Sequence, residues 1–255
     1  MKRRAFVAGG ATAGMIALAG CLSSDDELRE PRIEAPAFDA EWDRIDETYG
    51  VVFEDTYGPV TVTAKEHRVM YENATLRQEV REKTLDEVDA QLSLVFATRI
   101  GISPAIDRLP FGAGRSRLMA EIDAVGRRQF ESQLRNSGLE NVSLAEESEW
   151  ETDSGHAGSL SRYEASMEFD DVEFQIMEET SLTIEGDDVD VSGWLASWHD
   201  GSFATIAGGV HPAENFAKEI QESLSSAIDV TLRIDLGLEP ETYRQEVHDV
   251  LRSIR

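Results

Sequence analysis

Four side chains in the last third of the chain are of the types that bind small ligands by stacking and hydrogen bonding. They are Trp194, Trp198, His199 and His211. The β-rich run 189–198 predicts a strand, which would place both indole rings on the same face. An exposed face of this kind could stack a sugar or an apolar ligand, whereas a buried one would be ordinary core. We therefore treat the four residues as a possible ligand surface and leave the core interpretation open.

The other chemistry-bearing residues form no recognisable active site or metal centre. None of the five histidines belongs to an H-E-x-x-H motif, and no G-x-S-x-G elbow occurs. Four residues match the first half of a calcium loop: Asp188, Asp190, Ser192 and Gly193. His199 stands at the twelfth position, where that loop requires glutamate. We expect no catalytic residue, no metal and no cofactor, and we lean towards a protein that is not an enzyme.

Hydrophobic periodicity predicts the elements that would position these side chains. Helical spacing occurs at 38–49, at 115–137, and after Pro212 and Pro240. Strand-like runs occupy 51–53, 60–71, 92–100, 163–176, 182–184, 189–198, 203–210 and 230–236. Asp200-Gly201 is a strong two-residue hairpin turn. Helices grouped around hairpin-linked strands predict an α+β fold: an antiparallel β-sheet, with a hairpin meander in the C-terminal half, and several packed α-helices.

The N-terminus carries the only cysteine, Cys21, at the end of the run Leu18-Ala19-Gly20-Cys21. An apolar stretch of about fifteen residues precedes it, which is shorter than the roughly twenty residues of a membrane-spanning helix. These features resemble a lipoprotein signal, and the pair Arg3-Arg4 resembles the twin-arginine export signal. The resemblance implies cleavage before Cys21, a lipid on its sulfur and an extracytoplasmic protein anchored to the cell membrane. An ordinary apolar signal with a chance cysteine is the alternative.

The chain divides into three expected parts. Residues 1–21 form the signal, and the polar, proline-interrupted residues 22–37 would be a flexible tether. Residues 38–255 would be a single α+β globular domain, long enough to bury a core. Two sequons, Asn73-Ala74-Thr75 and Asn141-Val142-Ser143, are possible glycosylation sites in an exported protein.

Charge is extreme and unevenly spread. Without residues 1–20 the chain has 50 acidic against 21 basic residues, a net charge of −29, which excludes nucleic acid as a partner. Only four lysines occur against 20 arginines. From 99 to 135 the net charge is +3, whereas from 140 to 190 it is −16. The arginines would either dock an acidic partner or lipid headgroups, or pack against the protein's own acidic sheet.

The acid excess, the scarcity of lysine and the export signal together resemble exported haloarchaeal proteins. Three segments resemble a haloarchaeal lipoprotein family of unknown function: residues 192–198, the Asp200-Gly201 turn and residues 207–212. That family supplies no catalytic residues. We expect a non-catalytic cell-envelope lipoprotein that binds a protein or small ligand on the outer face of the membrane. The alternative is a substrate-binding or hydrolytic accessory lipoprotein with a pocket near Trp194, Trp198, His199 and His211.

Overall fold

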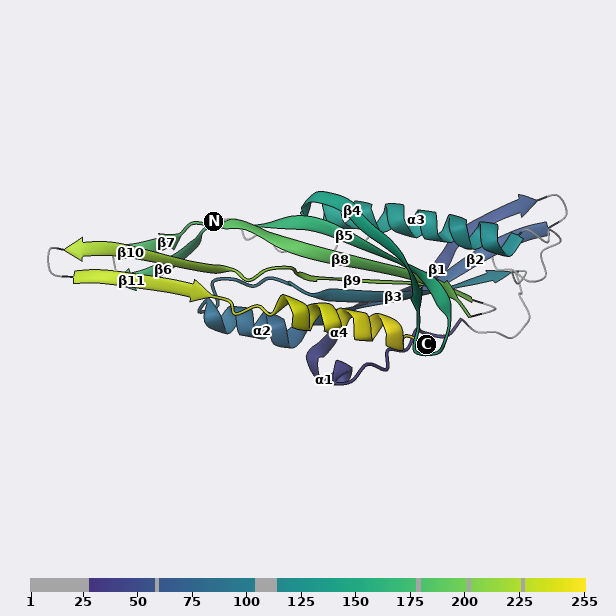
Figure 1. Cartoon of the computed structure of the whole chain (residues 1–255), viewed down its shortest axis with the longest axis horizontal. Helices are drawn as coiled ribbons and strands as arrows, with labels where there is room; N and C mark the ends of the chain where they lie inside the picture. The colour runs from purple at the N-terminus through teal and green to yellow at the C-terminus, as the bar shows by residue number, and fades with distance from the viewer. Residues whose placement is uncertain (1–27, 58–59, 104–113, 178–179, 201–202, 226–227) are drawn as a thin grey trace.

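The computed structural model describes residues 28–255 except 58–59, 104–113, 178–179, 201–202 and 226–227. Its main element is a seven-stranded antiparallel sheet with the order β1-β2-β3-β9-β8-β5-β4. These strands are β1 (Trp42–Tyr57), β2 (Val60–Asn73), β3 (Leu94–Ser103), β4 (Glu140–Glu151), β5 (Ala157–Phe169), β8 (Asp187–His199) and β9 (Phe203–Pro212). Two hairpins extend beyond one end of the sheet (Figure 1): β6 (Val172–Met177) with β7 (Thr180–Ile184), and β10 (Ala217–Ser225) with β11 (Ile228–Asp235).

Helices cover both faces of the sheet. The described residues contain α1 (Phe38–Glu41), α2 (Ala74–Lys83), α3 (Gly114–Asn136) and α4 (Pro240–Ser253). Helices α3 and α4 lie on opposite sides (Figure 1). Helix α3 packs closely on β8 at Gly193, where a Cβ would lie 3.3 Å from the Phe130 ring. Helix α4 packs closely on β9 at Gly209 of the other face, where a Cβ would lie 2.8 Å from Val247.

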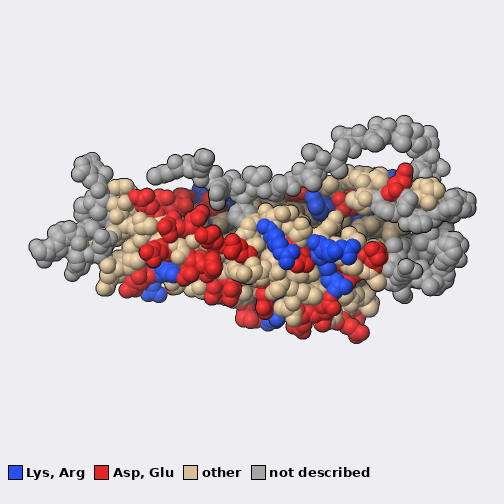
Figure 2. All heavy atoms as spheres, turned by 90° about the horizontal axis from the view of Figure 1, so that it is seen from above, with Lys and Arg blue, Asp and Glu red and all other residues tan. Residues whose placement is uncertain are grey.

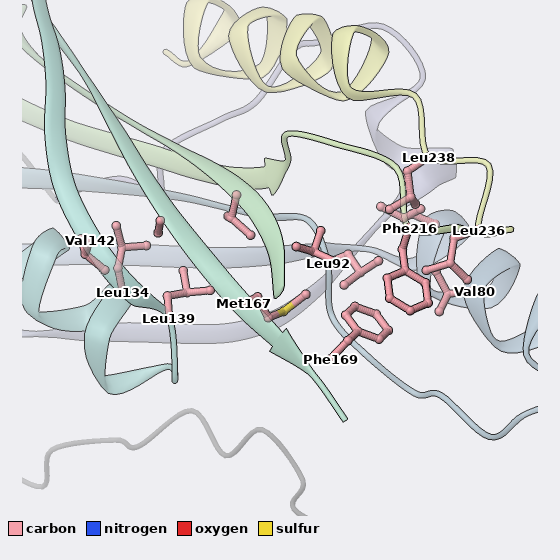
Figure 3. Packing of buried hydrophobic residues seen from close by; sticks show 14 of the residues in the cluster. Val80, Leu92, Leu134, Leu139, Val142, Met167, Phe169, Phe216, Leu236 and Leu238 are labelled. Atoms are coloured by element: carbon pink, nitrogen blue, oxygen red, sulfur yellow. The ribbon is translucent and has the colours of Figure 1, made fainter. Parts of the chain in front are cut away.

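Each face has its own core. On the α4 side, Trp194 and Trp198 of β8 pack with Val247 and other apolar residues of α4. On the α3 side, a second cluster runs from α3 to the two hairpins and α2 (Figure 3), where the rings of Phe169 and Phe216 stack with centroids 5.0 Å apart. Because both faces of β8 are covered, its run 193–198 is almost continuously apolar or small instead of alternating with charged residues.

The expected α+β fold with several packed helices is wrong. The part of the chain that the structure describes is mostly antiparallel sheet, with 53% strand against 24% helix. The helix expected over residues 38–49 lasts only from Phe38 to Glu41, and β1 begins at Trp42. Residues with helical spacing pair instead with β2, and Ile45 and Tyr49 are 37% and 56% exposed. The pattern misled because cross-strand pairing along a 16-residue strand outweighs a weak helical period.

The helix expected after Pro212 is also a strand. Residues 217–225 form β10, which pairs with β11 from Ala217↔Asp235 onwards. Ile220 and Leu232 face each other in this hairpin and pack against the α3-side core. Phe216, which we expected on a helical face, is instead buried against Phe169. Pairing with β11 satisfies the backbone hydrogen-bonding groups of this segment as a strand.

Other expected elements are confirmed. The helix predicted over 115–137 is α3, and Gly138 ends it with a φ of +88° while its N–H donates to the Arg135 carbonyl. The helix predicted after Pro240 is α4, with the proline in its first turn. The turn at Asp200-Gly201 lies partly outside the described residues, but Asp200 N–H donates to the Phe203 carbonyl and β8 pairs with β9 as a hairpin.

The segment before β1 lies against the domain from residue 28 onwards. Leu28 is 6% exposed, and a Cβ at Gly101 of β3 would lie 3.3 Å from its side chain. Arg32 and Arg255 exchange two backbone hydrogen bonds of 2.9 Å, which join this segment to the C-terminus. Among the helices that the structure describes, none combines the length and apolarity needed to cross a membrane.

Candidate functional site

The structure separates the four residues of the expected ligand surface. Trp194, Trp198 and His211 are 8%, 3% and 2% exposed and face α4. His199 lies on the opposite face, because side chains alternate along β8 and His199 follows Ser197, which contacts α3. A ligand could reach the two indole rings only if α4 moved away.

A polar contact within the α4-side core fixes Trp194. Its indole N–H donates to His211 Nε2 at 3.1 Å, and His211 Nδ1 lies 2.8 Å from the Pro212 carbonyl. The two contacts together require a neutral imidazole with its proton on Nδ1. Burial lowers the pKa of His211, which agrees with that state. The His248 ring of α4 stands edge-on to Trp194 with centroids 4.2 Å apart, and burial, with nearby Arg244 and Arg252, lowers its pKa to about 4.

A small hollow opens on the other face, between α3 and the ends of β5 and β8. Its volume is about 250 Å³. Residues of α3, β5 and β8 line it, among them Met119, Asp123, Ser159, Ser197 and His199. This volume lies below the roughly 300–1,000 Å³ of sites for drug-sized ligands. The hollow therefore suits a smaller molecule.

Three side chains of this hollow form one hydrogen-bonded cluster, which we call the Asp123 cluster: Asp123, Ser159 and Ser197. Asp123 Oδ1 accepts hydrogen bonds of 2.8 Å from both serine hydroxyls. Asp123 Oδ2 lies 2.9 Å from the Arg127 guanidinium, one helical turn along α3. The arginine holds the carboxylate in place, while the two serines fix its direction towards the sheet.

His199 adds an imidazole to the lining of the hollow. Its Nδ1 is buried and has no hydrogen-bond partner within the described part of the chain. A buried polar atom without a partner is costly, so a group that hydrogen-bonds to it would lower the free energy. The two serine hydroxyls also lie 3.0 Å from each other, so their two protons serve three contacts within the cluster. A serine hydroxyl oxygen has two lone pairs and could also accept a hydrogen bond from a ligand.

This arrangement supports binding better than hydrolysis. A serine nucleophile of the triad type gives its proton to an imidazole, which a carboxylate orients. Here Ser159 and Ser197 donate directly to Asp123, and no hydrogen bond between His199 and either serine occurs in the described structure. The carboxylate, the hydroxyls and the imidazole are instead a set of donors and acceptors for a ligand rich in hydroxyl or amino groups.

Among the α3 arginines whose side chains the structure describes, Arg127 and Arg135 are paired within the fold, whereas Arg128 is exposed. Arg127 pairs with Asp123 and also with Glu147 of β4. Arg135 pairs with Glu131 and donates to the Val142 carbonyl at 3.2 Å. On the face seen in Figure 2, basic side chains gather near the middle, and acidic ones crowd the half towards the hairpins. These contacts favour packing of α3 against the protein's own acidic strand over docking to an external anion.

The remaining predicted positions lie apart from the hollow. Cys21, Arg3 and Arg4 lie outside the described residues. Asn73 is 5% exposed and caps α2, accepting a 2.9 Å hydrogen bond from Leu76 N–H. Asn141 is exposed, and its amide donates to Ser166 at 2.9 Å. Glycosylation at either sequon stays a prediction.

Two other groups of carboxylates are brought together by the fold. A hollow of about 500 Å³ near Asp170 and Asp187 is lined mainly by acidic residues of the β5 and β8 ends. Asp187 already pairs with Lys218 at 2.5 Å, and charges of one sign do not by themselves select a ligand. Glu30, Glu47 and His67 form a group whose ligand atoms lie within 4.8 Å of one another, which could hold a metal ion.

Sequence reasoning missed most residues of the hollow. Asp123 lies on a helix that we expected, but 36 and 74 positions away from the serines to which it bonds. Nothing distinguishes it locally among 50 acidic residues. Of the four residues of the predicted ligand surface, Trp198 and His199 are among those that line the hollow. The His199 side chain points to the opposite face from the indole rings with which we had grouped it.

Comparison with known proteins adds a family but no activity. No curated protein and no solved structure matches this chain. Residues 30–255 match the family described as "Domain of unknown function (DUF6517)". The match includes Asp123, Ser159, Ser197 and His199 and covers both cores. The chain therefore belongs to the DUF6517 family.

Proposed function

We propose that this DUF6517 protein is a non-catalytic binding module of the cell envelope, held on the outer face of the membrane by a lipid on Cys21. The lipoprotein signal and the haloarchaeal type of composition support the location. The observation that carries the binding role is the hollow, which the Asp123 cluster and His199 line together.

The ligand we propose is a small polyhydroxyl compound, such as a monosaccharide or a polyol. Its hydroxyl groups would donate to the serine oxygens and could exchange a hydrogen bond with the His199 imidazole. The module would hold this ligand without altering it, because neither serine hydroxyl is activated by an imidazole.

Replacing Cys21 with Ser should release the protein from the membrane fraction. Without the thiol no lipid can be attached, and one signal stretch of about fifteen apolar residues is too short to span the bilayer stably. Fractionation of cells that express the full chain, followed by immunoblotting, measures the effect. The control Ser24→Ala leaves the cysteine intact and should remain in the membrane. Retention of the Cys21→Ser protein at the control level would contradict the lipid anchor.

Filling the hollow should abolish sugar binding. The full chain in detergent would be titrated with glucose, N-acetylglucosamine and glycerol, with the thermal midpoint and heat of binding recorded for each. At least one of these probes should raise the midpoint of the unsubstituted protein. Ser197→Val places methyl groups in the hollow and removes a hydroxyl, so it should eliminate the shift.

The matched control is Ser192→Val, on the same strand but on the face towards α4. It should leave the shift unchanged. If no probe binds the unsubstituted protein, the polyhydroxyl ligand is wrong. If Ser197→Val binds as well as the control, the site lies elsewhere.

A further inference from the structure

At the sheet edge away from the hollow, three potential metal ligands from distant parts of the chain converge. Glu30 belongs to the segment before α1, Glu47 to β1 and His67 to β2. Each offers one ligand atom, and the three atoms lie within 4.8 Å of one another. His67 is the most protected of them, with its side chain 13% exposed.

Both ring nitrogens of His67 face hydrogen-bond acceptors. Nε2 lies 2.8 Å from Glu47 Oε1, and Nδ1 lies 3.4 Å from the Leu28 carbonyl. A neutral imidazole has only one N–H, so it can satisfy only one of the two contacts. A metal ion on one ring nitrogen would let the other nitrogen keep the N–H and donate it.

The Leu28 carbonyl also determines which nitrogen would bind a metal. A carbonyl is an acceptor, so it favours the tautomer with the proton on Nδ1. The Nε2 lone pair then points towards Glu47 Oε1. Metal-binding histidines typically donate their other ring N–H to a carbonyl or carboxylate in this way.

Arg44 neutralises part of the negative charge of Glu30 and Glu47, and its hydrogen bonds and ion pairs within the described residues do not include the His67 ring. Its guanidinium contacts Glu30, Glu47 Oε2 at 3.0 Å and the Tyr71 hydroxyl at 3.0 Å. The Glu47 oxygen that it contacts is not the one facing His67. Arg44 would therefore compete with a metal ion for Glu30, whereas His67 Nε2 and Glu47 Oε1 would exchange their contact with each other for the ion.

We propose that Glu30, Glu47 and His67 form a binding site for a divalent transition-metal ion of the zinc class. One imidazole nitrogen with two carboxylate oxygens is a donor set that Zn²⁺ accepts, leaving a further position for water. Ca²⁺ and Mg²⁺ prefer sites made only of oxygen ligands. Because one ligand is a nitrogen, the site should prefer Zn²⁺ over the Ca²⁺ and Mg²⁺ that the acidic surface binds without specificity.

Binding would join the N-terminal segment to the β1–β2 hairpin. Glu30 lies nine positions after Cys21 in the sequence, and Leu28 already packs beside β3. An ion shared by Glu30, Glu47 and His67 would hold this segment against the sheet edge. The metal would thus fix the place where the chain leaves the domain towards its proposed anchor.

Zinc titration of the full chain in detergent tests the proposal. Isothermal titration calorimetry with ZnCl₂ should detect one site in excess Mg²⁺, which occupies unspecific carboxylates. His67→Ala should weaken this site at least tenfold. Glu30→Gln should weaken it as well, and it provides a second test if His67→Ala does not fold. Arg44→Gln should tighten it, because the competing guanidinium is removed.

Two controls separate a defined site from surface binding. His156→Ala removes a histidine that is not part of the cluster and Glu54→Gln an acid further along β1, so both should leave zinc affinity unchanged. Co²⁺ in place of Zn²⁺ should give a visible absorption spectrum that changes in His67→Ala. Equal zinc affinity in His67→Ala and in the unsubstituted protein, or complete displacement of zinc by Mg²⁺, would overturn the proposal.

Discussion

Replacing Trp194 with Ala should lower the free energy of unfolding by about 3–5 kcal/mol, the range for removing a buried tryptophan. The ring is 8% exposed, packs against His248 and donates to His211. Its loss would leave a cavity under α4 and a buried imidazole nitrogen without a donor. Urea denaturation at neutral pH, followed by circular dichroism, measures the change.

Two further variants divide this effect into its parts. Trp194→Phe keeps most of the packing but removes the N–H, so it should cost about 1–3 kcal/mol from the unpaired His211 Nε2 alone. Tyr49→Ala removes an aromatic ring that is 56% exposed on β1 and should change stability by no more than about 0.5 kcal/mol. A Trp194→Ala protein as stable as the Tyr49→Ala control would show that Trp194 belongs to an open ligand surface and not to the core.

Replacing Gly209 with Ala should destabilise the protein by about 1–3 kcal/mol, although the change adds only one methyl group. Gly209 lies in β9 where α4 crosses the sheet. A Cβ there would lie 2.8 Å from Val247 Cγ1, 3.0 Å from Val95 Cγ1 and 3.1 Å from the Leu94 carbonyl oxygen. The backbone oxygen cannot move away cheaply, so α4 or the strand must shift.

Gly50→Ala is the matched control, because Gly50 also lies in a strand of the same sheet. A Cβ at this position would meet no atom within 4 Å. Alanine should therefore be neutral, or stabilising by up to about 1 kcal/mol through the lower entropy of the unfolded chain. Equal effects of the two substitutions in urea denaturation would mean that α4 does not pack closely on β9.

Trp194→Ala and Gly209→Ala test the face of the sheet that α4 covers, whereas the Asp123 cluster lies on the face that α3 covers. Alternation along β8 separates them: Trp194 and Trp198 point towards α4, and Ser197 and His199 towards α3. A one-residue difference in position therefore decides whether a side chain belongs to a dry core or to a polar hollow. This is why the tryptophans and His199, adjacent in sequence, do not form one site.

Local patterns in the sequence were sufficient for several elements. The apolar residues of 115–137 with Gly138 after them, and Pro240 at the start of the last helix, predicted α3 and α4 correctly. The alternating runs between 163 and 210 predicted β5, β8 and β9. In each case the deciding interactions are within one element or at its ends, so neighbouring residues contain the information.

The sequence failed where partners far along the chain decide the structure. Trp42 to Tyr49 have helical spacing, yet they form a strand because β2, about 20 to 30 residues later, supplies hydrogen-bond partners. The segment 217–225 becomes a strand because β11 pairs with it. Both segments are amphipathic enough for either structure, and only the pairing chooses between them.

The sequence by itself determined the strong acidity, the positions of the two long helices and those of most strands, because these features depend on residue types and local spacing. The tertiary structure alone decided which side chains meet. Asp123 reaches Ser159 and Ser197, and Glu30 reaches Glu47 and His67, across separations of 17 to 74 residues. Such contacts follow from the strand order β1-β2-β3-β9-β8-β5-β4 and from the face on which each helix packs. No local pattern encodes that order, since it results from the burial of both faces of the whole sheet.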